Sequence, residues 1–201
     1  MRSPTTRDWM ILATTVSLGM VLLIAVATPR GDRVALALRA TARWSFLWFW
    51  LASSSGALFS LWGERFRALA QRARDFGLAF ASAHAVHIGL AIFLVYVLAA
   101  PFPRSKLIFF GVGAFWVYLL ALLSIKRVAA LLDAGAGRML RIIGTEYIAL
   151  VFIADFYQGP LQGGVMNVII YLPFLIMAVA GPLLRITAMV KRRSAIQRVV
   201  A

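Results

Sequence analysis

The chain has 201 residues, of which 62% are hydrophobic and 14% charged, and its formal net charge is +14 at pH 7. This composition excludes an ordinary soluble globular domain. The absence of cysteine excludes disulfides, iron–sulfur clusters, thiolate-ligated haem and thiol chemistry.

Six apolar stretches reach or approach the roughly 20 residues that an α-helix needs to cross a bilayer. Because the hydrocarbon offers no water to the backbone, each stretch must be helical. We therefore predict an all-α, integral membrane six-helix bundle that forms one transmembrane domain over residues 1–201. Its expected spans are 9–28, 44–62, 76–100, 107–125, 139–157 and 166–184.

The first stretch resembles a secretory signal, because Arg2 and Arg7 precede it and Ala25-Val26-Ala27 could be a cleavage site. It is longer than a signal core, so we expect a retained membrane anchor. The next segment, 32–43, is either an interfacial helix or the start of the second span. In the second span, Ser53-Ser54-Ser55-Gly56 predicts a face packed against another helix. A proton or ion path is the alternative there, but no carboxylate accompanies the serines.

Basic residues lie in the tails and connections, and they are unevenly divided. Of the 21, 15 fall on the side of the amino terminus and six on the other. The positive-inside rule then places both termini in the cytoplasm, in a multi-pass protein of a bacterial-type inner membrane. The positive charge therefore indicates topology and contact with anionic lipid, and no nucleic-acid partner is expected. Segment 158–164, rich in glycine and proline, is predicted to be an outer loop.

The third span contains the only two histidines, His84 and His87, three residues apart. Residues with this spacing share a helix face, so both rings can approach one ligand. An ionisable group inside a membrane helix is a functional-site candidate. Three interpretations remain open: haem ligation, a metal site that needs further ligands, or neutral histidines bonded to a neighbouring helix.

The fifth span carries the remaining charged candidates. Glu146 is expected to pair with Arg141 or to act as a proton carrier, whereas Asp155 is expected near the outer surface in water. No nucleophile–base pair, phosphate-binding loop or zinc motif is present, so the sequence assigns no hydrolase or transferase reaction.

Several landmarks resemble the ferric-reductase-like transmembrane domain family, which includes the haem-bearing membrane subunit of the periplasmic methionine sulfoxide reductase system. Ala42-Arg43-Trp44 opens the second span, and Arg74-Asp75-Phe76-Gly77-Leu78 leads into the third. A histidine follows the glycine by about ten positions in the family, and here this is His87. The segment 137–147 resembles the entry to the family's fifth helix.

The resemblance implies transmembrane electron transfer with haem b as cofactor, with His87 and then His84 as cofactor-binding residues. It also implies a separate electron donor among other membrane or soluble redox subunits. The chain departs from the family at Ile143, where a histidine of the fifth helix is expected. Two imidazoles therefore cannot clasp a haem across these two helices. The alternative is a haem-free structural or accessory subunit of a larger membrane complex.

Overall fold

The computed structural model describes residues 4–29, 31–161 and 164–200, and these are helical, without a strand in any of the three segments. The predicted all-α class is confirmed. The long helices are α1 (Thr6–Ala27), α2 (Arg33–Trp62), α4 (Ala73–Ile92), α5 (Arg104–Leu122), α7 (Ala134–Leu161) and α8 (Val165–Val200). Shorter elements connect them: η1 (Gly63–Phe66), α3 (Arg67–Gln71), η2 (Phe93–Val97) and α6 (Lys126–Ala129).

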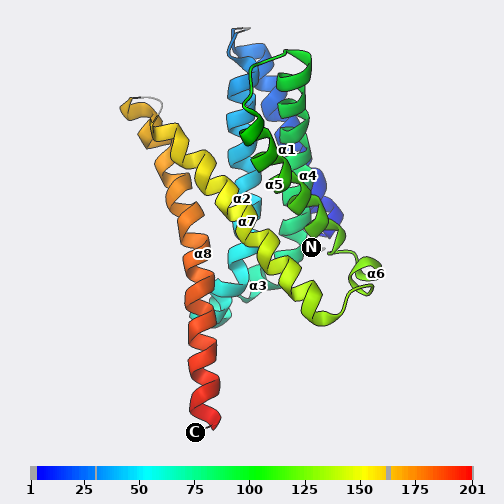
Figure 1. The fold of residues 1–201 in the computed structure, drawn as a ribbon, viewed down its shortest axis with the longest axis vertical. Coiled ribbons are helices and arrows are strands. Elements are labelled where there is room, and N and C mark those ends of the chain that lie inside the picture. The colour runs from blue at the N-terminus through cyan, green and yellow to red at the C-terminus, as the bar shows by residue number, and fades with distance from the viewer. Residues whose placement is uncertain (1–3, 30, 162–163, 201) are drawn as a thin grey trace.

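The bundle is arranged around α2, which packs against α1, α4 and α8. α7 packs against both α8 and α5 (Figure 1). The carboxyl-terminal part of α8 extends beyond the other helices (Figure 1). Its 36 residues correspond to about 54 Å of helix, well over the hydrocarbon thickness of about 30 Å.

Four helices are long and apolar enough to cross a membrane: Thr6–Ala27, Ala73–Val97, Arg104–Leu122 and Val165–Ser194. They coincide with the first, third, fourth and sixth expected spans. The second and fifth expected spans lie in α2 and α7, which have 30 and 28 residues. Serines in α2 and charged residues in α7 lower the hydropathy of these two helices. By composition, the described residues thus support a multi-pass membrane protein with four clear spans.

The helix bounds differ from the predicted spans in several places. Residues 33–43 belong to α2 without a break, so this segment begins the second long helix. The third long helix changes to a π-helix at Phe93 and ends at Val97, before the prolines at 101 and 103. α7 continues through Leu161, so most of the predicted loop 158–164 is helical. The preference of glycine and proline for turns is a weak local bias, and the continuing helix overrides it here. Residues 162 and 163 of the predicted loop lie outside the described segments.

Aromatic side chains form the core between α2, α4 and α7. Phe46 lies with its ring centroid 5.1 Å from that of Phe152 and 4.9 Å from that of Phe156. Phe49 packs on Phe80 at 5.3 Å and on Phe152 at 5.5 Å. Aromatic pairs at such separations add to the stabilisation from buried area. This core fixes α7 against α2 and α4.

The small-residue face of α2 is only partly as predicted. Ser54 and Ser55 are fully buried, which confirms a packed face at these positions. Gly56 is exposed, and a Cβ added there would meet nothing within 4 Å. The glycine lies about one hundred degrees around the helix from Ser55 and points away from the bundle. Within the chain, Gly56→Leu is therefore expected to be tolerated.

Candidate functional site

His84 and His87 lie on the face of α4 that packs against α2. Their rings are stacked, with centroids 5.0 Å apart and an interplanar angle of 24°. On α2, Ser45 Oγ is 3.1 Å from His84 Nδ1, and Thr41 Oγ1 is 3.1 Å from His87 Nδ1. Each histidine thus has its own hydroxyl, and the four-residue spacing of the hydroxyls matches the three-residue spacing of the histidines on a neighbouring helix.

The hydroxyls determine which ring nitrogen carries the proton. Thr41 Oγ1 donates to the Ala37 carbonyl at 2.8 Å, and Ser45 Oγ donates to the Ala42 carbonyl at 3.0 Å. A hydroxyl has one proton, so with that proton on the carbonyl each oxygen accepts its other bond from imidazole Nδ1–H, which assigns the ring proton to Nδ1. In this tautomer Nε2 of both rings is unprotonated. An imidazole anchored through one nitrogen and free at the other is the usual arrangement of a metal-ligating histidine.

Both histidines line a cavity of about 460 Å³ between α2, α4, η2, α5 and α7. This volume falls within the range of about 300–1,000 Å³ that is usual for ligand and cofactor sites. Much of the lining is apolar, including Val117 from α5 and Ile148 and Phe152 from α7. The ring of Phe152 lies 6.0 Å from the ring of His84, centroid to centroid. The cavity is therefore cofactor-sized, with imidazoles on one side only.

Charged side chains also line the cavity: Arg39, Arg43, Lys106 and Asp155. The Arg43 guanidinium carbon lies 4.4 Å from the Tyr171 ring centroid, a cation–π contact. Arg43 Nε is buried and has no hydrogen-bond partner in the described part of the chain. Lys106 Nζ donates to Gln158 at 3.0 Å. Three cations against one carboxylate favour an anionic group on a ligand in this cavity.

Asp155 is not in the solvated position that the sequence predicted. It is half-buried and lines the cavity, because α7 continues past it to Leu161 and keeps it on the inner face of the helix. Ile143 is exposed and lies outside the cavity lining. A histidine at position 143 would consequently not face His84 or His87 in this arrangement.

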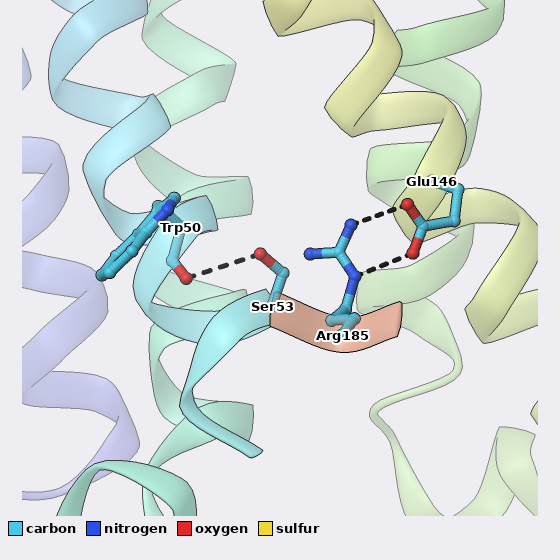
Figure 2. A network of polar contacts seen from close by, with 4 residues as sticks. All are labelled: Trp50, Ser53, Glu146 and Arg185. Carbon is cyan, nitrogen blue, oxygen red and sulfur yellow. Dashed lines mark hydrogen bonds and ion pairs between the residues drawn. The ribbon is translucent and has the colours of Figure 1, made fainter. Parts of the chain in front are cut away.

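The expected pairing of Glu146 with Arg141 is wrong. Glu146 instead accepts from Arg185 of α8, with Nε–Oε1 and Nη2–Oε2 both at 2.7 Å (Figure 2). Arg141 donates to the Leu123 carbonyl at 3.3 Å. Five residues along a helix turn Arg141 well away from Glu146, whereas α8 brings Arg185 opposite it. The pair joins α7 to α8 and lies outside the cavity lining.

Sequence reasoning found the two histidines but missed the residues that orient them. Thr41 and Ser45 lie four residues apart in an apolar stretch, a spacing that would have indicated a polar face toward another helix. Nothing in the sequence indicated that Arg43 and Lys106 line a cavity, because both were counted among the basic residues that indicate topology. Within the described segments, no three side chains of His, Cys, Asp or Glu come together as a metal site.

Comparison of the chain with protein-family models, with curated proteins and with solved structures finds no match.

Proposed function

We propose that this chain is a six-span membrane protein of ferric-reductase-like type that binds haem b in the cavity beside His84 and His87. Its function would be transmembrane electron transfer, with electrons supplied by a separate donor subunit. Both termini would face the cytoplasm, in line with the distribution of basic residues and the alternating course of the long helices. α2 and α7 supply the two further spans, since each is long enough to cross the bilayer.

One observation carries this proposal: two imidazoles, each held through Nδ1 by a hydroxyl of α2, line one cavity of about 460 Å³. His87 would be the residue that holds haem, because the resemblance aligns it with the family's histidine. His84 is closed in by Phe80 and Phe152, with centroids 5.1 and 6.0 Å from its ring.

The charge of the cavity fits the same cofactor. Haem bound there would supply one-electron redox chemistry. Arg39, Arg43 and Lys106 could hold its two carboxylates, and Arg43 Nε has a hydrogen bond to give. The apolar residues of α5 and α7 exclude water from the other side. The residues of the cavity thus fit a haem ligated from α4 alone.

A second candidate function is a haem-free accessory subunit of a membrane complex. The apolar part of the lining favours it, because the residues that α5 and α7 bring to the cavity include Val117, Ile148 and Phe152 and no histidine. In that case each histidine would serve only as a hydrogen-bonded link between α4 and α2.

Absorption spectroscopy separates the two candidates. The protein is produced in membranes with ample haem, purified in detergent, and compared with His87→Ala and His84→Ala. We expect a Soret band in the wild type, its loss in His87→Ala, and its retention in His84→Ala. Carbon monoxide should shift the band of the reduced protein, because the chain has no histidine besides His84 and His87, which share one face of α4. If the wild-type protein has no Soret band after expression with its native partners, the haem proposal is refuted and the accessory-subunit function remains.

A further inference from the structure

The end of α2 meets α8 at a corner of the bundle that does not line the histidine cavity (Figure 1). α2 ends at Trp62, and the chain turns at Gly63, where φ is 70° and glycine is favoured. The last carbonyls of an α-helix have no partner within the helix. Here Lys191 Nζ of α8 donates to the Ser60 carbonyl at 3.5 Å and to the Leu61 carbonyl at 3.3 Å. A cation of α8 therefore caps the carboxyl end of α2.

The next residue of α8, Arg192, is held at the same corner by its side chain. Its Nε donates to Ser60 Oγ at 3.1 Å, and the side chain is otherwise exposed. In the described segments no acceptor is found for its two terminal nitrogens, Nη1 and Nη2. Two parallel N–H groups of a guanidinium match two oxygens of a phosphate or a carboxylate. Ser60 thus orients a guanidinium whose outer edge can bind an anion.

Basic residues greatly outnumber acidic ones in the segments that meet at this corner. Segments 60–75 and 191–201 together carry eight basic residues and two acidic ones. Glu64 is already paired with Arg67 at 2.6 Å, and Asp75 accepts a hydrogen bond from α1. Neither carboxylate is therefore bonded to the cations that α8 brings to the end of α2. The corner has a positive charge that an anionic ligand would neutralise.

Trp62 indicates the depth of the corner in a bilayer. Its side chain is 54% exposed and lies beside that of Phe66, with ring centroids 6.0 Å apart. Exposed tryptophans at the ends of membrane helices favour the head-group region. The clear span in α8, Val165–Ser194, ends near the same level, because Lys191 contacts a carbonyl next to Trp62. The cations would then lie at the depth of lipid phosphates.

We propose that the corner formed by Ser60, Lys191 and Arg192 binds the phosphate group of an anionic phospholipid. Arg192 donates from Nη1 and Nη2 to two phosphate oxygens, and Lys191 supplies the second cation. A lipid fits better than an acidic protein, because the exposed aromatic pair of Trp62 and Phe66 beside the cations suits the boundary between head groups and acyl chains.

The bound phosphate would bridge α2 and α8, so the lipid should stabilise the fold. This inference rests on the membrane placement in the proposed function and not on haem. The Soret band of the protein is therefore expected to be the same with and without the lipid, and a failure of either proposal can be recognised separately.

Thermal unfolding of the full-length protein in a non-ionic detergent, followed by tryptophan fluorescence, tests the site. The protein is titrated with a phosphatidylglycerol, with a phosphatidylcholine that has the same acyl chains, and with inorganic phosphate. A ligand that binds only the folded state raises Tm as its concentration increases. We expect phosphatidylglycerol to raise Tm, and the other two to leave it nearly unchanged at the same concentrations.

Variants locate the site. Lys191→Gln combined with Arg192→Gln should weaken the apparent affinity for phosphatidylglycerol about 30-fold, from the usual contribution of two basic residues near a lipid surface. Ser60→Ala keeps both charges but no longer orients the guanidinium, and should weaken it about 3–10-fold. The matched control is Arg127→Gln combined with Arg138→Gln, which removes two exposed arginines of α6 and α7, away from α8 (Figure 1). It should change the affinity less than about threefold.

Other outcomes would overturn the proposal. Equal weakening by the two double variants would mean that the charge of the whole surface attracts lipid, without a discrete site. An equal rise in Tm with inorganic phosphate would assign a soluble anion in place of lipid. If the variant without Lys191 and Arg192 does not fold, native mass spectrometry of the wild type and of Ser60→Ala decides. The wild type should retain phosphatidylglycerol in preference to phosphatidylcholine, and Ser60→Ala should retain less of it. A wild type without this preference would refute the lipid site and leave the corner to an acidic protein.

Discussion

Replacing Thr41 with valine tests how the histidines are oriented. Thr41 is fully buried, and its Oγ1 lies 3.1 Å from His87 Nδ1. Valine has nearly the same shape but cannot accept a hydrogen bond, so Nδ1–H of His87 would be left buried without a partner. The loss of such a partner costs about 1–3 kcal/mol. For a chain of this size, that corresponds to a fall in Tm of roughly 2–12 °C.

The same change should weaken any ligand held by Nε2. Without its acceptor, the imidazole can move its proton to Nε2 and rotate, and removal of such an orienting partner typically lowers ligand affinity by about 10–100-fold. We would measure Tm by tryptophan fluorescence and haem binding by titration at the Soret wavelength. Ser45→Ala should affect His84 in the same way but alter haem affinity less than Thr41→Val.

The control is Thr187→Val in α8, where an exposed hydroxyl donates only to the Leu183 carbonyl of its own helix at 2.9 Å. A double-mutant cycle gives the decisive comparison, since Thr41→Val should have little effect once His87→Ala has removed the ring. If Thr41→Val lowers Tm equally with and without His87, the hydrogen bond between them does not exist in solution and the assigned tautomer is wrong.

Three further predictions concern the fold. A Cβ on Gly144 would lie 2.6 Å from a ring carbon of an α5 tryptophan. Gly144→Ala should therefore push α5 away from α7 and lower the free energy of unfolding by about 1–3 kcal/mol. An unchanged Tm would contradict this close approach. In denaturant titrations, Glu146→Gln should lower the free energy of unfolding more than Arg185→Gln does. The reason is that the Arg185 side chain is 14% exposed against 43% for Glu146, so Glu146→Gln leaves the more buried charge without its partner. The reverse order would refute this role of the ion pair. Reporter fusions at Gln162, a position outside the described residues, and after Ala201 should report opposite sides of the membrane, and matching signals would exclude six spans.

The sequence predicted the helical class well, because apolar stretches of bilayer length leave the backbone no other choice. It predicted helix ends less well. α8 continues 16 residues past 184, since its polar carboxyl-terminal part is helical without being apolar. Hydropathy detects which residues lie in lipid, and it does not detect where a helix stops.

The partner of Glu146 was mispredicted for a related reason. Arg141 was chosen because it is near in sequence, but Arg185 lies 39 residues away and meets Glu146 only after α7 and α8 pack. Local spacing gives the pairs within one helix and says nothing about pairs between helices. The histidines could be found because they are rare in such a chain, whereas Thr41 and Ser45 acquire their role only from the contact of α2 with α4.

Polar and apolar lining residues of the cavity come mostly from different helices. α2 and α4 supply the imidazoles, their hydroxyl partners and the two arginines of the lining, whereas Lys106 of α5 and Asp155 of α7 are the further charged groups there. α5 and most of the facing part of α7 supply apolar surface, and an aromatic core fixes α7 in place. Under the proposed function, a cofactor in the cavity would therefore be held mainly from α2 and α4.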